Sequence, residues 1–252
     1  MTLLERPISE PPATAPRSPA PVRRSPALRH ERVILREGAR LVAGMDEVGR
    51  GSLAGPVSVG VVVVDARTRA CPPGVADSKL LTAAARTALL PALGRWGLAR
   101  AVGHASAAEI DEVGIIAALR MAGMRALETV AGAVGPVDAV LLDGSHDWLT
   151  PPAQGELFGE VELPGADVVG VPRVHVRVKA DLTCASVAAA SVLAKCERDG
   201  IMTRMAADHP QYAWDSNKGY SSAEHIRALR EHGPSPVHRR SWRLPLGLDA
   251  AG

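Results

Sequence analysis

Four short apolar runs constrain the fold of this 252-residue chain more than any other feature. They are rich in valine, leucine and alanine, and they cover residues 40–46, 56–64, 139–143 and 173–178. Runs of this length and composition predict β-strands. Helices are predicted over residues 79–94, 106–133, 181–207 and 222–231. Strands that alternate with helices predict an α/β fold with a central sheet, to which the last two helices add a helical layer or subdomain.

Composition divides the chain into three parts. Seven of the 20 prolines fall within the first 26 residues, where no apolar periodicity is visible. We predict a disordered Pro/Arg-rich arm over residues 1–30, because such a segment buries too little surface to offset its ordering entropy. The main domain follows over residues 31–208. Residues 209–252 form a C-terminal helical segment with a candidate basic face, which carries Lys218, Arg227, Arg230, Arg239, Arg240 and Arg243.

Charge and cysteine content exclude several classes of protein. The 29 basic and 27 acidic residues leave a net charge of +2, which is too small to indicate nucleic-acid binding by itself. Three cysteines without ligand spacing predict neither a disulfide framework nor a zinc site. No apolar run approaches the ~18 residues of a membrane span, and the N-terminus has no hydrophobic signal core. We expect a cytoplasmic, monomeric protein without membrane association.

Acidic residues stand at the ends of two predicted strands. Residues 44–57 read GMDEVGRGSLAGPV, so Asp46 and Glu47 precede a glycine-rich loop. Successive strand residues point to opposite faces, so both acids face one site only if the strand ends at Asp46 and Glu47 belongs to the turn. The glycines favour that ending. Asp143 ends another apolar run, at the sheet edge where ligands bind in open α/β folds, and Asp181 precedes the long helix.

These acids also have plain structural interpretations. Asp143 can cap a turn, and Asp181 is placed to be the N-cap of the long helix. Asp199 lies on the same helix face as Asp181 but about 27 Å further along, so we assign it to a structural ion pair. If the other acids converge, a set of oxygen ligands without Cys or His suits Mg2+ or Mn2+ rather than zinc.

Six motifs between residues 40 and 243 carry a resemblance to a known family. They are GMDEVGRGSLAGPV, DSKLL (77–81), LLDG (141–144), KADLTCASVAAASVLAK (179–195), NKGY (217–220) and PVHRRSW (236–242). In this order they resemble the type 2 ribonucleases H, ribonuclease HII. The resemblance implies a ribonuclease H-like fold, with a central mixed β-sheet flanked by helices and a C-terminal helical subdomain. The chain departs from the family at Ala180, where glycine is usual, and at Trp242, where phenylalanine is frequent.

The resemblance also implies roles for single residues. The catalytic carboxylates, which hold Mg2+ or Mn2+, are Asp46, Glu47, Asp143 and Asp181. The substrate-binding residues are Gly49, Arg50, Gly51, Ser78, Lys79, Lys195 and Tyr220. The first three read a ribose 2′-hydroxyl mainly through backbone groups, and Tyr220 packs against the next sugar. Ser78, Lys79 and Lys195 lie near the nucleic-acid backbone, although a surface position is an equally good interpretation of Lys195.

The implied activity is that of an endonuclease for RNA/DNA hybrids. It hydrolyses the RNA strand by a two-metal mechanism, and nicks 5′ of a single ribonucleotide in duplex DNA to leave 3′-hydroxyl and 5′-phosphate ends. Its partners are these duplexes, and any replication or repair protein that binds it is undefined by sequence. Two alternatives remain open, namely a junction resolvase or integrase-like nuclease that ignores the 2′-hydroxyl, and a nucleic-acid-binding module without turnover.

Overall fold

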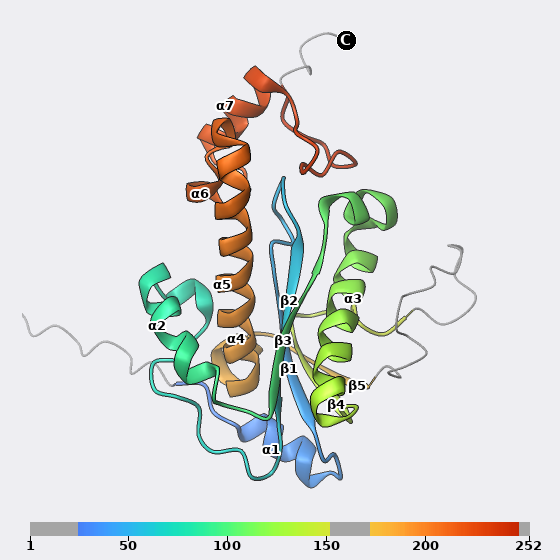
Figure 1. Ribbon diagram of the computed structural model, residues 1–252. Coiled ribbons are helices and arrows are strands. Elements are labelled where there is room, and N and C mark those ends of the chain that lie inside the picture. The colour runs from blue at the N-terminus through green and yellow to red at the C-terminus, as the bar shows by residue number, and fades with distance from the viewer. Residues whose placement is uncertain (1–24, 152–171, 247–252) are drawn as a thin grey trace, which may run out of the picture.

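A computed structural model of the protein describes residues 25–151 and 172–246 (Figure 1). Its centre is a five-stranded sheet in the order β3-β2-β1-β4-β5. The strands are β1 (Val42–Val48), β2 (Val57–Val64), β3 (Ala99–Ala105), β4 (Ala139–Asp143) and β5 (Arg173–Arg177). β1 and β3 pair antiparallel with β2, whereas β4 pairs parallel with both β1 and β5. The predicted mixed sheet is therefore confirmed.

Helices cover both faces of the sheet. They are α1 (Arg29–Arg36), α2 (Ala83–Leu93), α3 (Ala107–Val134), α4 (Ala180–Thr183), α5 (Ala185–Asp208), α6 (Trp214–Asn217) and α7 (Ala223–His232), with short 3-10 helices at Ser78–Leu80 and Pro210–Tyr212. In Figure 1, α5 and α3 lie on opposite sides of the sheet, and α6 and α7 lie at the far end of α5. None of the described helices has the length and apolarity needed to cross a membrane.

Small residues let α5 lie unusually close to the sheet. A Cβ atom added at Gly44 in β1 would collide with Ser186 of α5, and one added at Gly60 in β2 would collide with the backbone of Ala190. Both glycines are needed because helix backbone occupies the space that their side chains would fill. The alanine-rich composition of the chain follows from this close packing of helix on sheet.

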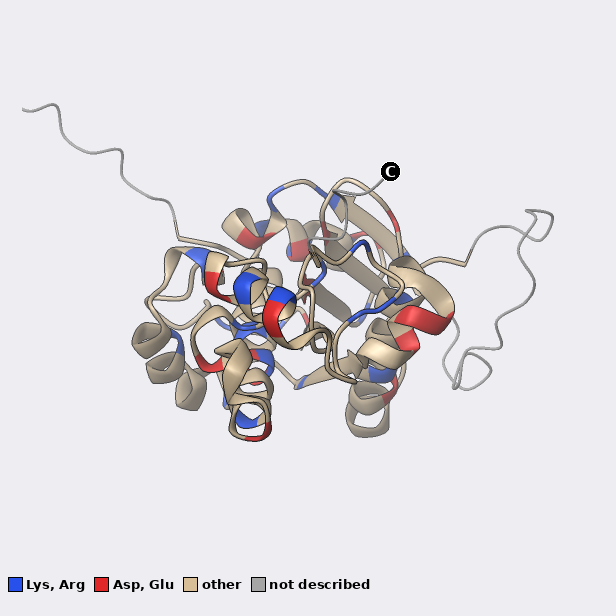
Figure 2. Cartoon of the chain, turned by 90° about the horizontal axis from the view of Figure 1, so that it is seen from above, with Lys and Arg blue, Asp and Glu red and all other residues tan. Residues whose placement is uncertain are grey.

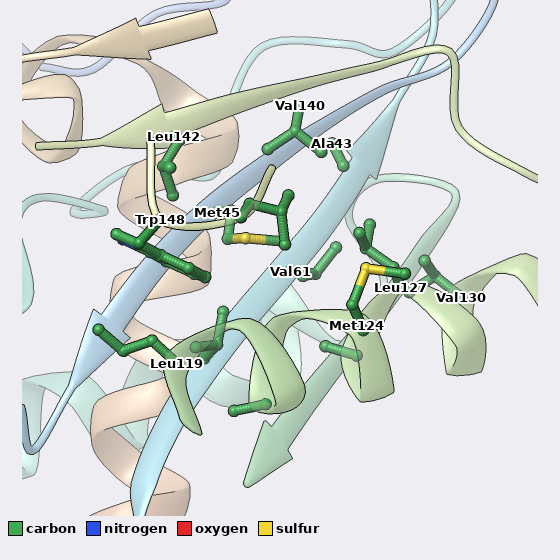
Figure 3. Packing of buried hydrophobic residues seen from close by; sticks show 14 of the residues in the cluster. Ala43, Met45, Val61, Leu119, Met124, Leu127, Val130, Val140, Leu142 and Trp148 are labelled. Atoms are coloured by element: carbon green, nitrogen blue, oxygen red, sulfur yellow. The ribbon is translucent and has the colours of Figure 1, made fainter. Parts of the chain in front are cut away.

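The core has three parts. One lies between the sheet and α3, where Met45, Leu119, Leu127 and Trp148 meet (Figure 3). A second lies between the sheet and α5 and is built mostly of alanine and valine. The third lies beyond the sheet, under α6 and α7, and contains Trp214 and its stacked neighbour in the preceding 3-10 helix. The C-terminal layer therefore has an apolar core of its own.

Three features of the fold differ from the prediction. β1 runs through Glu47 to Val48, because its ladder with β2 continues that far. β3 was not predicted, since its sequence ARAVGHA has only weak alternation and its strand lies at the edge of the sheet. Residues 25–30, assigned to the arm, belong to the folded body, where Leu28 is buried and Ala27 bridges to Cys184. Residues 1–24, which make up most of the predicted arm, lie outside the described residues, as do residues 152–171 and 247–252.

The predicted cap of the long helix is wrong. α5 begins after Cys184, whose side chain makes no capping hydrogen bond, and Asp181 lies inside the separate helix α4. Glu31 of α1 takes the capping role instead. Its Oε1 accepts from the backbone N–H of Ser186 at 2.9 Å and from the Ser186 hydroxyl at 2.7 Å. A side chain from a distant segment thus satisfies a free donor at the start of α5.

Replacing Glu31 tests this cap. Glu31 is completely buried, and burial raises the pKa of its carboxyl group. Glu31→Ala leaves the Ser186 donors unsatisfied, so we expect the free energy of unfolding in urea at pH 7 to fall by about 1–3 kcal/mol. Glu31→Gln keeps an acceptor oxygen for both donors and should lose less. Equal losses in the two variants would contradict a capping role.

Candidate active site

The parallel pairing of β1 with β4 brings two predicted acids to one level. Met45 pairs with Leu142, so the next residues of the two parallel strands, Asp46 and Asp143, lie side by side. The negative charge of Asp143 raises the pKa values of Asp46, Glu47 and Asp181, although burial is the larger cause for each. All four predicted carboxylates are therefore electrostatic neighbours, and Asp143 is the member that interacts with the other three.

Asp46 is the most deeply buried of the four. It is 4% exposed, and burial raises the pKa of its carboxyl group to about 8, with Glu47 and Asp143 adding to the rise. The Ser191 hydroxyl and the Lys79 ammonium lower this pKa without reversing the shift. Asp46 is accordingly a carboxyl group that needs additional positive charge nearby to stay ionised at neutral pH.

Glu47 approaches the site from the other side of β1. Because it lies within the strand, it shares the side of Met45, which packs towards α3, whereas Asp46 shares the side of Gly44, which packs on α5. The prediction that Glu47 belongs to the turn is wrong. Its carboxylate still reaches the strand end, where it lies 3.6 Å from the Arg50 guanidinium and feels the charge of Asp143.

Asp143 positions Asp181 through the backbone. Its Oδ1 accepts from the N–H of Ala180 at 2.7 Å and of Asp181 at 3.4 Å. The preceding Lys179 has a φ of 59°, which turns the chain from β5 into α4. Ala180, which replaces the usual family glycine, is fully buried at this turn. Asp143 is thus a cap, as its structural interpretation proposed, but the N–H groups that it caps belong to α4 and not to its own turn.

Lys79 lies at the mouth of this cluster. Its Nζ is 3.5 Å from Asp181 Oδ2, and its side chain is 71% exposed. Burial lowers the pKa of Lys79, but the charges of Asp46, Asp77 and Asp181 outweigh burial and raise it. Ser78, in contrast, is buried and accepts a 2.8 Å hydrogen bond from Ser191. Only Lys79 of this predicted pair presents its side chain to solvent.

The four acids fit hard divalent cations by their chemistry. Their donors are carboxylate oxygens alone, which Mg2+ and Mn2+ prefer. Burial and mutual repulsion raise the pKa values of three of them, and a bound cation would relieve that repulsion. Within residues 25–151 and 172–246, no three His, Cys, Asp or Glu side chains are already arranged to hold a metal ion.

A fully buried arginine fills the glycine-rich loop from within. The Arg239 guanidinium donates to the carbonyl oxygens of Gly49 at 2.6 Å, of Arg50 at 2.8 Å and of Gly55 at 3.2 Å. It also stacks 4.8 Å from the centre of the Trp242 ring. Arg239 was predicted on a basic surface face, and this is wrong, because three loop carbonyls hold its charge inside the protein.

A second buried arginine connects the loop to Tyr220. Arg198 of α5 donates to the Ser52 hydroxyl, to the carbonyl oxygens of Ala54 and Pro56, and to that of Lys218. Its guanidinium lies 5.4 Å from the centre of the Tyr220 ring. The sequence analysis missed Arg198, although its spacing of three and seven residues from Lys195 and Ser191 places all three on one face of α5.

The two glycines of the loop have different surroundings. Gly49 is buried with a φ of 83°, and a Cβ atom there would collide with Arg198. Gly51 is exposed, and a Cβ atom there would meet nothing within 4 Å. Within the described residues, the backbone N–H groups of Arg50 and Gly51 have no hydrogen-bond partner. The outer half of the loop therefore offers free donors to a molecule outside the chain.

Tyr220 and Lys195 lie together beside this loop. Tyr220 is 36% exposed, and the Lys195 Nζ is 5.7 Å from the centre of its ring. Lys195 also pairs with Asp199 at 2.7 Å, and Arg86 pairs with Asp199 at 3.4 Å. The predicted structural ion pair of Asp199 is confirmed. Lys195 is accordingly held by an acid on its own helix rather than standing free in solvent.

A buried pair of neutral histidines supports Tyr220 from below. His238 Nδ1 accepts from the N–H of Ser235 at 2.9 Å, so its proton lies on Nε2, which donates to His225 Nε2 at 3.0 Å. His225 in turn donates from Nδ1 to the carbonyl oxygen of Tyr220 at 2.9 Å. Trp214 also donates to His225 Nε2. These bonds require one tautomer of each ring, and the Ser235 hydroxyl also lies 2.9 Å from His238 Nδ1.

Charges over the C-terminal end are mixed. Seen from above in Figure 2, basic and acidic positions alternate over the helices. Arg227 and Arg230 share α7 with Glu224 and Glu231. The candidate basic face is therefore interrupted by acids and has lost Arg239 to the interior.

This chain is similar to proteins of known identity. The family model described as Ribonuclease HII matches residues 43–244. The ribonuclease HII of Streptomyces avermitilis is 44% identical over 205 residues, which cover 81% of this chain and 78% of that protein. The ribonuclease H2 structure from Pyrococcus horikoshii OT3 has a TM-score of 0.61 at 23% identity and covers 81% of this chain and 95% of that one. The structure of Bst-RNase HIII in complex with Mn2+ has a TM-score of 0.56 at 20% identity, and the match covers 82% of this chain and 68% of that one.

Replacing Arg239 tests whether it orders the loop. Arg239→Lys can hold one carbonyl oxygen but not three, so we expect the free energy of unfolding to fall by roughly 2–4 kcal/mol. Arg240→Lys is the matched control, because the neighbouring Arg240 side chain is exposed. Denaturant unfolding of both variants measures the difference. Similar stabilities would show that the loop does not depend on the buried guanidinium.

The histidine pair predicts a pH dependence of stability. Burial, with the charge of His225, lowers the pKa of His238 to about 4 from an ordinary 6.5. A lowered histidine pKa stabilises the fold above pH 6.5, and this stabilisation disappears as the pH falls towards 4. We expect the free energy of unfolding to fall by about 2 kcal/mol between pH 7 and pH 5 through His238.

A non-titrating variant isolates this contribution. In His238→Asn the side-chain oxygen can replace Nδ1 as the acceptor for Ser235, and nothing titrates at that position. Urea unfolding at both pH values should therefore give a smaller pH dependence for the variant than for the unmodified protein. Identical dependences would contradict the assignment to His238.

Proposed function

Given that this chain belongs to the ribonuclease HII family, we propose that it nicks duplex DNA on the 5′ side of a single embedded ribonucleotide. As a member of that family it is a ribonuclease H, an enzyme that hydrolyses the RNA strand of RNA/DNA hybrids. The nick leaves a 3′-hydroxyl and a 5′-phosphate, which is the first step of removing a ribonucleotide from DNA.

The observation that carries the proposal is the adjacency of acids and loop. Only Val48 separates Glu47 from Gly49, so a nucleotide whose sugar contacts the loop has its phosphate beside the carboxylates. Asp46 and Asp143 are the proposed principal ligands of Mg2+ or Mn2+, and Glu47 and Asp181 complete the set. The bound ions would supply activation of water and stabilisation of the leaving oxygen.

The outer loop is the proposed reader of the ribose. Arg239 engages the carbonyl oxygens of Gly49 and Arg50 from inside, whereas the N–H groups of Arg50 and Gly51 have no partner within the described residues. A sugar hydroxyl is an acceptor for such donors, and only a ribonucleotide carries one at the 2′ position. Arg198 holds Tyr220 at a set distance from the loop, so that its ring can pack on the next sugar.

Substrate choice distinguishes this proposal from its main alternative. A resolvase-like or integrase-like nuclease uses the same acidic chemistry but has no need of a 2′-hydroxyl. We expect a labelled duplex with one ribonucleotide to be nicked with Mg2+ or Mn2+ and to remain intact in EDTA, and its all-DNA counterpart to remain intact throughout. Equal cutting of both duplexes would favour the alternative nuclease, and tight binding without any cutting would favour a binding module.

The carboxylates are tested on the same duplex. Asp46→Asn should lower the nicking rate by roughly 100-fold or more, since changes even to residues behind a metal ligand cost 10–100-fold. Asp65→Asn is the matched control, because Asp65 directly follows β2 and bonds only within its own turn. Unchanged nicking by Asp46→Asn would contradict the assignment of the metal site.

A further inference from the structure

β5 carries basic residues on one of its two sides. Its sequence continues as RVHVRVK over residues 173–179, so Arg173, His175 and Arg177 alternate with three valines. Val174 packs into the core beneath α3, and the basic residues therefore face the opposite side, where α1 lies. In the register of the sheet, Arg177 lies directly opposite Asp143. The basic side of β5 thus begins at the edge of the carboxylate cluster.

Residues from α1 and α4 extend this basic side. Thr183 of α4 accepts a long, 3.5 Å hydrogen bond from Arg177 Nε, and its carbonyl oxygen accepts from the N–H of Ala27, two residues before Arg29. Burial lowers the pKa of His30, and the charges of Arg177 and Arg29 lower it further. Arg177 is thus joined through Thr183 to the segment that carries Arg29, and Lys179 follows Arg177 by two residues. We name Arg29, Arg177 and Lys179 the β5 strip.

The positive charge of the β5 strip is not used inside the protein. Arg29 and Lys179 are exposed, Arg177 is half-buried, and none of the three forms an ion pair with an acid in the described part of the chain. Glu31, two residues after Arg29, is buried and accepts hydrogen bonds from Ser186, whereas Asp143, opposite Arg177, and Asp181, two residues after Lys179, belong to the candidate metal site.

The β5 strip and the ribose-reading loop lie on opposite sides of the carboxylates. The loop follows β1, whereas the strip extends from β5, and β4 with Asp143 lies between these two strands. A nucleic-acid strand that places one nucleotide at the loop and its phosphate at Asp46 continues past the loop in one direction and past the β5 strip in the other. Arg50 and Lys79 already contact the acids Glu47 and Asp181 of the site, so the strip provides positive charge beyond these two cations.

We propose that the β5 strip binds the sugar-phosphate backbone of the duplex on the side of the cut that faces away from Tyr220. The inference rests on the proposed function for the direction of the substrate, but the binding itself needs no cleavage. Three cations in an open row suit the regularly repeated phosphates of a duplex, and each phosphate that they neutralise releases counterions.

The test is binding of labelled duplexes in EDTA, followed by fluorescence anisotropy at several salt concentrations. The variant is Arg29→Gln with Lys179→Gln, since both side chains are exposed. Its affinity should fall about tenfold near 0.1 M salt, and the slope of log K against log salt should become less steep by about 2. The matched control is Arg67→Gln with Arg69→Gln, which removes two exposed charges from the segment after β2, at the end of the sheet away from Asp46, and should change neither value.

Trimmed duplexes locate the contact. When base pairs are removed from the side of the duplex that faces away from Tyr220, the difference in affinity between the variant and the unmodified protein should disappear. Trimming the side that faces Tyr220 should preserve this difference. An effect equal to that of the control, or insensitive to trimming on either side, would overturn the proposal. If the unmodified protein bound in this way but did not nick the ribonucleotide with Mg2+ or Mn2+, the proposed function would fail and the β5 strip would stand.

Discussion

The close contact of α5 with β1 and β2 sets the positions of most residues in the site. Because Gly44 and Gly60 have no side chains, the helix lies against the strand backbones, and its residues meet the sheet at fixed heights. Ser186 receives the cap from α1, Ser191 lies beside Asp46, and Arg198 reaches the loop. One straight element therefore sets the distance from the carboxylates to the ribose-reading loop, as rigid support of a site requires.

The site separates two kinds of buried charge. Burial, with the negative charge of Asp143, raises the pKa values of Asp46 and Glu47, so added cations would favour their ionised forms. Arg198 and Arg239 are buried without carboxylate partners, and carbonyl dipoles of the loop satisfy most of their donors. If acids had satisfied these arginines, acidic side chains would lie under the loop and would repel a phosphate. Carbonyl partners order the loop and leave the net positive charge beneath it.

The sequence was most informative where a role depends on local pattern. Asp46 and Asp143 could be placed on strands because each follows an apolar run, although β1 continues two residues beyond Asp46. Contacts between distant segments had no such signal. The cap from Glu31 spans 155 residues and the bond from Arg239 to Gly49 spans 190, so neither residue carries a local mark of its role. Glu47 was misplaced because glycines suggested a turn where the ladder with β2 extends β1.

The long span from Gly49 to Arg239 also has a consequence for biosynthesis. A ribosome adds about 5–20 residues per second, so the 190 residues between them take about 10–40 s to appear. Throughout that time the strand with Asp46 can fold, but the loop lacks the guanidinium that engages three of its carbonyl groups. The loop proposed to read the ribose is therefore completed late in translation, and a truncated product that ends before Arg239 has the acids but lacks the guanidinium that holds this loop.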